Sequence, residues 1–374
     1  MLEVTKVHDI FIATLFTYLG YDKTIFNEEN FEVYKVENGC NGKGGSSNYF
    51  LKYPYGDNDI RVSNLRSETF ESWLVVNSVE NISKSKVKNI LFNLEKTAKY
   101  YDDSIPARKL FTRVGYDLDA NGDEKIYLYL HNGNREVVEI DSQGWRIIKD
   151  CQAKVLFENP GIMTPLFTPM HGEKIDEIRN FINVNDEDLY LVIGWLLAAL
   201  TPNSKVDCPI LWLNAPKGTG KTTATKFLKR LIDPDIGGTI SPIGTSRDFA
   251  ASVSSRYIVG IDNVSKITPK MSDVYCRAVT GDTLSRRKLF TDNTVNNVNM
   301  HCHLMINGMN DAPLRSDLQD RCFQITLRRL NANNRKSNDE LENYFKERGS
   351  YILGALLDAV SAGLRNNAYI PMLE

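Results

Sequence analysis

The chain has 374 residues, of which 42% are hydrophobic and 25% are charged, and its formal net charge is -2. This length suffices for two or three domains with cores of their own, and the composition is typical of a soluble globular protein. The near-balanced charge excludes a uniformly basic surface, so any contact with nucleic acid must come from local patches.

The sequence carries no pattern of a secreted or membrane protein. Its six cysteines are scattered without a Cys-x-x-Cys pair, which is typical of reduced thiols. The first residues lack the layout of a signal peptide. The longest apolar runs, such as Ile193 to Leu200, are far too short to span a bilayer. We therefore predict a cytoplasmic protein that makes no membrane contact.

Residues 1–103 are predicted to form a mixed N-terminal domain of unknown role. Helical periodicity covers Ile10 to Tyr21 and Lys84 to Tyr100, and Tyr49 to Tyr53 resembles a strand. The second helix has a lysine-rich face, which is more often a solvated helix side than a DNA-binding patch. The Gly- and Ser-rich residues 38–47 are interpreted as a surface loop, because no strand precedes them and no Lys-Thr pair follows.

Residues 104–160 change to period-two patterns and are predicted to be a small β domain of hairpins. The alternating stretches are Lys125 to Leu130, Glu136 to Ile140 and Trp145 to Ile148. Asp117 to Gly122 matches the first half of a calcium-binding loop, but Leu128 occupies the twelfth position, where that loop needs a bidentate Glu. We interpret this segment as a hairpin turn.

Three further segments complete the predicted organisation. Residues 161–203 form a helical linker region, in which helical sequence covers Asp176 to Leu200. Residues 204–330 form the P-loop ATPase core, and residues 338–374 form a helical C-terminal segment after a polar break. The predicted fold class is therefore α/β, with a parallel sheet in the core.

The core begins with a phosphate-binding loop between a buried strand, Ile210 to Leu213, and a helix that starts near Thr222. Gly218 and Gly220 let the backbone curl so that several N–H groups face one anion, and the helix N-terminus adds its positive dipole end. Lys221 is predicted to reach the β- and γ-phosphates of ATP, and the Thr222 hydroxyl to hold Mg²⁺. The predicted nucleotide-binding residues are Ala215 (in place of the first glycine), Pro216, Lys217, Gly218, Thr219, Gly220, Lys221, Thr222 and Thr223.

Two later strands carry polar residues at their ends. Asp262 follows a buried stretch that starts at Arg256 and is predicted to orient Mg²⁺ through water. Asn263 stands where many such ATPases carry the Glu that activates water; its amide cannot accept a proton but can orient water. Asn307 ends a strand that starts at His303 and is predicted to position the attacking water or the γ-phosphate. The identity of the catalytic base stays open.

The segment His301-Cys302-His303 suggests metal binding. On a strand, however, His301 and His303 share one face and Cys302 points to the other, so the three side chains cannot converge. We therefore expect no metal there.

Arg321 precedes the last strand of the core, Phe323 to Leu327. An arginine there is well placed to reach the γ-phosphate of a neighbouring subunit and to stabilise the charge of phosphoryl transfer. A surface salt bridge with Asp317 or Asp320 is the alternative, and Arg315 is the reserve candidate. A role for Arg321 in trans implies an oligomer, most simply a closed ring.

A basic β-hairpin is predicted between the second and third strands of the core, with arms Leu284 to Phe290 and Val295 to Met300. Cations bind phosphates by charge, and a phenylalanine can touch a base or sugar. The residues predicted to grip DNA are Arg286, Arg287, Lys288 and Phe290. A basic hairpin on the subunit surface is the alternative.

This order of parts resembles the AAA+ helicases. The segments that carry the closer resemblance are Asp262-Asn263-Val264-Ser265, Arg286 to Phe290, Asn307-Gly308, Asp317 to Arg321, Asp186 to Thr201 and Gly354 to Asp358. They look like replication ATPases of phages and of integrative and pathogenicity-island-type mobile elements, which are similar to MCM and superfamily 3 viral helicases. The resemblance covers roughly residues 105–365.

This resemblance implies a hexameric motor that hydrolyses ATP between subunits and threads a DNA strand through a pore lined by the hairpin. Asn263 is usual in that family, so by analogy hydrolysis need not be lost. Relatives typically continue beyond the last helix, so a truncated chain, or a missing lid or origin-binding module, is an open expectation.

The leading functional prediction is an ATP-dependent DNA helicase that replicates a phage or mobile genetic element. Its expected cofactors are ATP and Mg²⁺. Its expected partners are single-stranded or forked DNA, further copies of the chain, and replication proteins of the same element. One alternative is a helicase loader or remodeller, which has no need of a cationic pore. The other is a nucleotide-gated origin-binding protein with little hydrolysis, which the missing Glu beside Asp262 keeps open.

Overall fold

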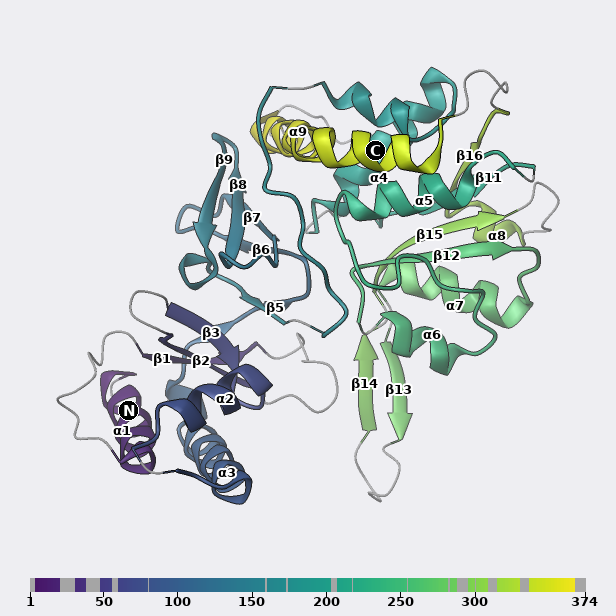
Figure 1. Ribbon diagram of the computed structural model, residues 1–374. Helices are drawn as coiled ribbons and strands as arrows, with labels where there is room; N and C mark the ends of the chain where they lie inside the picture. Colours follow the sequence, from purple (N-terminus) through teal and green to yellow (C-terminus); the bar gives the residue numbers. More distant parts are fainter. Residues whose placement is uncertain are drawn as a thin grey trace. The chain divides into compact units, whose positions relative to one another are not determined.

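The computed structural model divides the protein into two units, Met1–Phe111 with Lys149–Glu158 and Thr112–Ile148 with Asn159–Glu374 (Figure 1). The residues that the structure describes are 4–20, 31–37, 48–55, 60–79, 81–158, 160–172, 174–202, 207–216, 218–253, 255–281, 283–287, 295–299, 301–308, 315–329 and 336–366. The finer five-part division expected from the sequence stays a prediction.

The first unit is a mixed sheet covered by three helices. Its sheet has the order β3-β2-β1-β4, in which only the pairing of β1 with β4 is parallel. The elements are α1 (Val4–Leu19), β1 (Glu32–Val36), β2 (Tyr49–Pro54), β3 (Ile60–Asn64), α2 (Glu68–Val76), α3 (Lys84–Tyr100), β4 (Ala107–Arg108), β5 (Leu110–Phe111) and β10 (Leu156–Phe157). Apolar residues of all three helices and of β1 and β2 form one core.

The second unit begins with an antiparallel sheet of four strands in the order β6-β7-β8-β9. These are β6 (Val114–Leu118), β7 (Glu124–Tyr129), β8 (Glu136–Asp141) and β9 (Gly144–Lys149). Between β6 and β7, the Asp119 carboxylate accepts the backbone N–H groups of Asn121 at 2.8 Å and Asp123 at 3.0 Å. The segment is thus a hairpin turn, as its flanking strands indicated, and not a calcium loop.

The larger part of the second unit is built on a parallel sheet in the order β12-β15-β11-β16. Its strands are β11 (Ile210–Asn214), β12 (Ile258–Val264), β15 (His303–Gly308) and β16 (Cys322–Thr326). Successive residues of a strand face opposite sides. Accordingly, Leu211 and Leu213 contribute to the core on one face of the sheet, while Ile210 and Trp212 contribute to the core on the other.

Helices cover both faces of this sheet (Figure 1). On one side lie α4 (Asp186–Ala199), α5 (Lys221–Arg230) and the long α9 (Asn338–Asn366); on the other lie α6 (Ser246–Val253), α7 (Pro269–Thr280) and the short α8 (Ser316–Gln319). The predicted α/β class with a parallel sheet is confirmed. The first part of the expected helical linker is a 3-10 helix, η4 (Ile175–Asn180). None of the helices in the described ranges is long and apolar enough to cross a membrane.

Candidate functional site

The predicted phosphate-binding loop lies between β11 and α5, at the carboxyl edge of the parallel sheet. β11 is the strand at which the chain order reverses, because β15 and β16 flank it, and such a point is where open α/β sheets bind ligands. Gly218 (φ 83°) and Gly220 (φ 86°) both adopt the left-handed conformation that the tight turn requires. Gly220 caps the helix, so the first N–H groups of α5 face the loop. Lys217 lies outside the described residues.

The Lys221 ammonium group is folded back onto this loop. Its Nζ donates to the carbonyl oxygens of Ala215 at 2.5 Å and Pro216 at 3.0 Å. Burial lowers the pKa of Lys221, and the Asp262 carboxylate opposes that shift. Thr219 donates its hydroxyl to the Pro216 carbonyl oxygen at 3.0 Å and closes the loop from within.

Thr222 and Asp262 meet directly, although forty positions separate them in the chain. The Thr222 hydroxyl donates to Asp262 Oδ1 at 2.8 Å. Thr222 lies in the first turn of α5 and Asp262 near the carboxyl end of β12. Gly260 of β12 lies beside α5, where a Cβ would make an ordinary contact with Thr225 at 3.5 Å and a tight one with Thr239 at 3.3 Å.

Asp262 and Asn263 form a bulge in β12. The parallel register with β15 runs through Ile261 and shifts before Val264, so two residues of β12 face Asn307 of β15. Asn263 has φ 60°, a left-handed conformation that asparagine adopts more readily than most residues. Such bulges redirect side chains next to functional sites.

Asn307 is buried beside this bulge, and both ends of its amide are engaged. Its Oδ1 accepts the backbone N–H of Asn263 at 2.8 Å, and its Nδ2 donates to Thr225 Oγ1 at 2.9 Å. The side chain is 1% exposed. The geometry therefore places Asn307 as a residue that fixes Asn263, and direct contact with phosphate or water stays a prediction.

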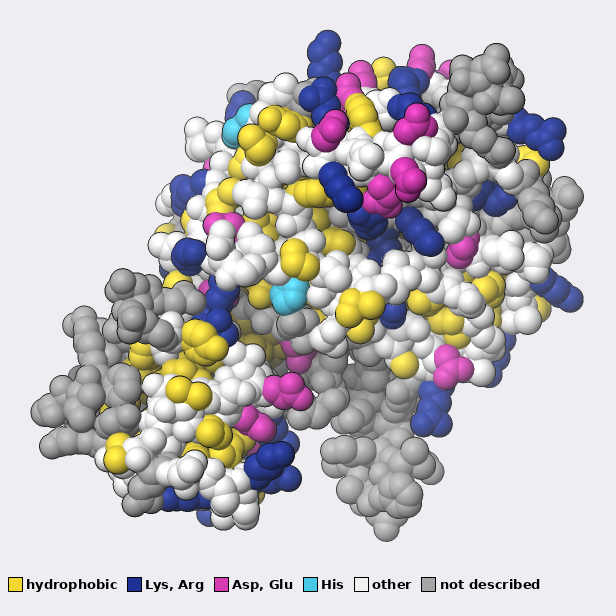
Figure 2. Space-filling view, in the orientation of Figure 1, with side chains coloured by type: hydrophobic (Ala, Val, Ile, Leu, Met, Phe, Trp, Pro, Cys, Tyr) yellow, Lys and Arg dark blue, Asp and Glu magenta, His cyan; other side chains and the backbone are white. Residues whose placement is uncertain are grey.

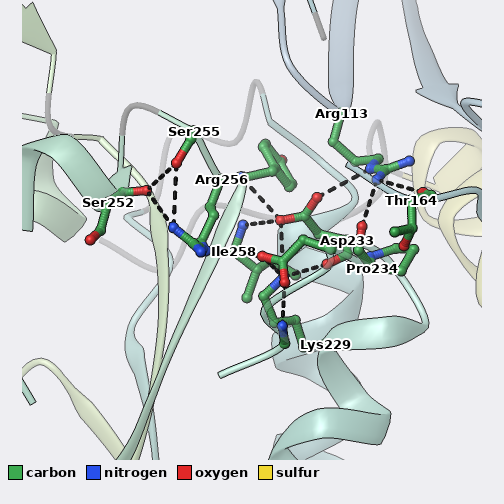
Figure 3. Close-up of polar contacts among 12 residues, drawn as sticks. Arg113, Thr164, Lys229, Asp233, Pro234, Ser252, Ser255, Arg256 and Ile258 are labelled. Carbon is green, nitrogen blue, oxygen red and sulfur yellow. Dashed lines mark hydrogen bonds and ion pairs between the residues drawn. The ribbon is translucent and has the colours of Figure 1, made fainter. Parts of the chain in front are cut away.

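A buried cluster of charges lies at the other end of α5 (Figure 3). The Asp233 carboxylate is paired with Arg113 at 3.2 Å and Lys229 at 3.5 Å, and it accepts the backbone N–H groups of Tyr257 at 3.0 Å and Ile258 at 2.8 Å. Burial alone would raise the pKa of Asp233, but these cations and the Ile258 N–H hold the pKa below its ordinary value.

The same cluster extends to Asp235 and Arg256. Asp235 Oδ2 lies 3.0 Å from Lys229 Nζ and 2.9 Å from Arg256 Nε. Arg113 also donates to the carbonyl oxygens of Tyr129, Thr164 and Pro234. Because it pairs with Asp233, Arg113 fastens the antiparallel sheet to the end of α5 and to the start of β12.

Arg321 lies at the amino edge of the parallel sheet, opposite the phosphate-binding loop. Its backbone oxygen accepts the N–H of Ile210, the first residue of β11, and four strand steps of about 3.3 Å separate that edge from the loop. The exposed Arg321 side chain donates to the Asp317 carbonyl oxygen at 2.8 Å. The reserve candidate, Arg315, is instead paired with the carboxylates of Asp273 and Asp317.

The predicted hairpin is confirmed as a pair of antiparallel strands, β13 (Thr283–Arg287) and β14 (Val295–Asn299). Arg286 faces Asn296 and Arg287 faces Val295 in its register. Lys288, Phe290 and the turn lie outside the described residues. The roles predicted for the four residues stay predictions.

His303, the first residue of β15, and Cys302 just before it point to opposite sides of the sheet, as the strand pattern predicted. Cys302 belongs to the core that contains α7, whereas His303 Nε2 lies 3.0 Å from Tyr257 Oη on the other face. Burial lowers the pKa of His303 to about 3. Among the described residues, no group of His, Cys, Asp and Glu side chains could hold a metal ion.

The residues at the loop nevertheless fit a nucleotide with a Mg²⁺ ion. Mg²⁺ takes oxygen ligands, keeps several waters and shares substrate phosphates, so it needs only one or two protein oxygens. Thr222 Oγ1 and Asp262 Oδ1 supply two neighbouring oxygens. At the end of β11, just before the loop, Asn214 Oδ1 is buried and has no hydrogen-bond partner among the described residues.

Comparison with known families adds an independent finding. Residues 173–372 match the model of the family described as "Actinomycete integrative conjugative element replication protein", and this match covers more than half of the chain. The chain belongs to this family. The replication protein has no match among curated protein sequences.

Among solved structures, the replication protein is similar to the apo form of the NrS-1 C-terminal region. That similarity has 13% identity and a TM-score of 0.46, and it covers 89% of this chain and 69% of the other. It is also similar to the JCV helicase bound to an acetamide compound, with 16% identity, a TM-score of 0.32 and 53% of each chain covered.

Thr225 and the charged cluster are functional or structural residues of the replication protein that the sequence patterns did not indicate. Thr225 lies about one helical turn after Thr222, and this spacing indicates that the two side chains are neighbours on the helix surface. Lys229 and Asp233 have the four-residue spacing that usually marks an exposed ion pair, yet the two side chains are 1% and 4% exposed. Nothing in the local sequence around Arg113 distinguished it from a surface arginine.

Proposed function

We propose that this replication protein is an ATP-dependent DNA helicase with an AAA+ P-loop core, which acts as a hexameric ring in replication of a mobile genetic element. The single observation that carries the proposal is the 2.8 Å contact of Thr222 with Asp262 beside the glycine turn. It brings together the hydroxyl and the carboxylate that Mg·ATP requires, one from the first turn of α5 and the other from the carboxyl end of β12. Family membership supplies the context of replication.

The residues at the loop divide the work. When bound, Mg·ATP supplies the phosphoryl group and the free energy of its hydrolysis. Lys221 exchanges the Ala215 and Pro216 carbonyl oxygens for phosphate oxygens, and the N–H groups of the loop orient the same anion. Asn263, fixed by Asn307, orients water through its exposed amide.

Arg321 acts in trans in this proposal. It lies at the edge of the sheet away from its own loop, so its guanidinium serves the site of a neighbouring subunit, as an arginine finger does. Its only hydrogen bond to a described residue is to the backbone oxygen of Asp317, and that bond costs little to exchange. Arg286, Arg287 and Lys288 grip DNA from the hairpin.

A second candidate is a nucleotide-gated origin-binding protein with little hydrolysis. The observation that favours it is Asn263, whose amide has no proton-accepting power where a carboxylate would activate water. Turnover separates the two candidates.

The test measures ATP turnover with and without single-stranded DNA, and strand displacement on a forked duplex. A helicase hydrolyses ATP faster with DNA and separates the strands. Lys221→Ala is expected to abolish both activities, because the phosphates lose their cation. Nucleotide binding without turnover or displacement would instead support the gated protein. ATP turnover without displacement would support a loader or remodeller.

A further inference from the structure

A row of exposed side chains runs along α3 at intervals of four residues. Its members are Lys84, Lys88, Phe92, Lys96 and Tyr100. Residues four apart are neighbours on a helix surface, so two lysines are followed by Phe92, Lys96 and Tyr100, and each step rises by about 6 Å and turns by about 40° around the helix axis. Phe92 is 63% exposed and Tyr100 is 81% exposed.

The row is not needed to hold the first unit together. Other positions of α3 supply the core, namely Val87, Ile90, Leu91, Leu94 and Ala98. The exposed side chains of Phe92 and Tyr100, which lie in line with the lysines, therefore do not contribute to the packing of this helix. A binding surface accounts for that alignment better than the core does.

The charge of the row is also unbalanced. Lys84, Lys88 and Lys96 form no ion pair with any residue that the structure describes. Glu95 is the only acidic residue of α3, and its carboxylate forms an ion pair with Arg66 Nη2 at 2.5 Å. In Figure 2, dark blue Lys and Arg side chains border the part of the first unit in which α3 lies.

We propose that this α3 row is a binding site for single-stranded DNA. The lysines pair with backbone phosphates, and Phe92 and Tyr100 stack on bases. A duplex is a poorer fit, because its base faces are already stacked and offer an aromatic ring nothing to cover. The site lies outside the matched residues 173–372, and it requires neither ATP nor the hairpin.

Photo-crosslinking of the full chain to oligothymidylate carrying 5-iododeoxyuridine tests the position directly. Cleavage after Lys and Arg yields residues 89–96, which contain Phe92, and residues 100–108, which contain Tyr100. We expect the crosslink in one or both of these peptides, and equally in Lys221→Ala without nucleotide. The crosslink of the Lys221→Ala variant distinguishes this site from the proposed ATPase site, because DNA binding at α3 does not depend on ATP hydrolysis. No crosslink in either peptide would overturn the proposal.

Equilibrium binding of the same oligonucleotide at several salt concentrations tests the chemistry. For Lys88→Ala/Lys96→Ala, the slope of log affinity against log salt should become shallower by about 1.4, from about 0.7 per phosphate contact. Phe92→Leu should bind about tenfold more weakly, and Phe92→Trp should bind normally, because loss of one stacked base costs that order of affinity.

The matched control is Lys149→Ala/Lys154→Ala, which removes two exposed lysines outside α3 and should leave affinity and slope unchanged. If the α3 variants bind like the wild type, the row is a solvated helix surface. If a duplex binds as tightly as the single strand and Phe92→Leu has no effect, stacking is wrong and the proposal fails.

Discussion

The side-chain oxygen of Asn307 accepts the backbone N–H of Asn263 at 2.8 Å and thereby fixes a residue whose φ is 60°. The bulge removes a backbone hydrogen bond between β12 and β15, and the Asn307 side chain of β15 supplies a hydrogen bond in its place. The position of the Asn263 amide at the carboxyl edge of the sheet depends on this contact.

A comparison of Asn263→Gly with Asn263→Ala distinguishes the role of the Asn263 side chain from the effect of its backbone conformation. Both remove the amide, so ATP turnover should fall about a hundredfold in each if the amide orients water. Only the alanine variant should also lose stability, by about 1 kcal/mol, because glycine suits a positive φ and alanine does not. Steady-state turnover and urea unfolding measure the two effects. Full turnover in the glycine variant would show that the side chain has no catalytic role.

Asp233→Asn should destabilise the protein by about 3 kcal/mol, because it leaves Arg113 and Lys229 buried without their carboxylate. Urea unfolding of the full chain measures this loss. The control is Asp186→Asn, in the exposed ion pair with Arg179, which should cost less than about 1 kcal/mol. Similar values for the two variants would contradict a structural role for the buried cluster.

His303 should make the stability depend on pH. Tyr257 donates its hydroxyl proton to the Ala199 carbonyl oxygen at 2.7 Å, so the Tyr257 oxygen is left to accept the N–H of His303 Nε2. Burial lowers the pKa of His303 to about 3 in the folded protein, against about 6.5 in the unfolded chain. The contribution of the neutral, buried His303 to the free energy of unfolding is therefore fully present above pH of about 6.5 and is lost as the pH falls toward 3.

The measurement compares the wild type with His303→Gln, which keeps an N–H donor for Tyr257 but does not titrate. Between pH of about 7 and 5.5, the free energy of unfolding of the wild type should fall by about 1 kcal/mol more than that of the variant. Parallel pH profiles would mean that His303 is protonated without cost.

Mixing of variant subunits tests Arg321. Arg321→Ala subunits and Lys221→Ala subunits should each be inactive alone and should recover ATP turnover when combined, because one supplies an intact loop and the other an intact arginine to the same interface. Arg315→Ala in place of Arg321→Ala is the matched comparison. Complementation only by the Arg315 variant would transfer the role to that residue.

The hairpin should couple ATP turnover to DNA. In Arg286→Ala/Arg287→Ala/Lys288→Ala, basal hydrolysis should remain within about twofold of the wild type, while displacement of a forked duplex should be lost because the cations that hold phosphates are gone. Normal displacement by this variant would exclude the hairpin as the DNA-gripping element.

Short-range patterns predicted most of the sheet and its loop. The glycine spacing and the buried strands located β11, α5 and β15 to within a residue or two. They did not predict the bulge at Asp262 and Asn263, since a bulge depends on the register of two strands far apart in sequence. The pairing of Arg113 with Asp233 likewise spans 120 positions, and only the packed structure brings the two together.

The contacts of the Asp233 carboxylate restrict how α5 and β12 can separate. One carboxylate binds the end of the helix through Lys229 and the start of the strand through Tyr257 and Ile258. Thr222 and Asp262 lie at the far ends of the same two elements, each roughly 15 Å away along the chain axis. The helix and the strand are thus held together at the Asp233 end by buried ion pairs and hydrogen bonds, so the contact between Thr222 and Asp262 at the other end can be exchanged without breaking those of Asp233.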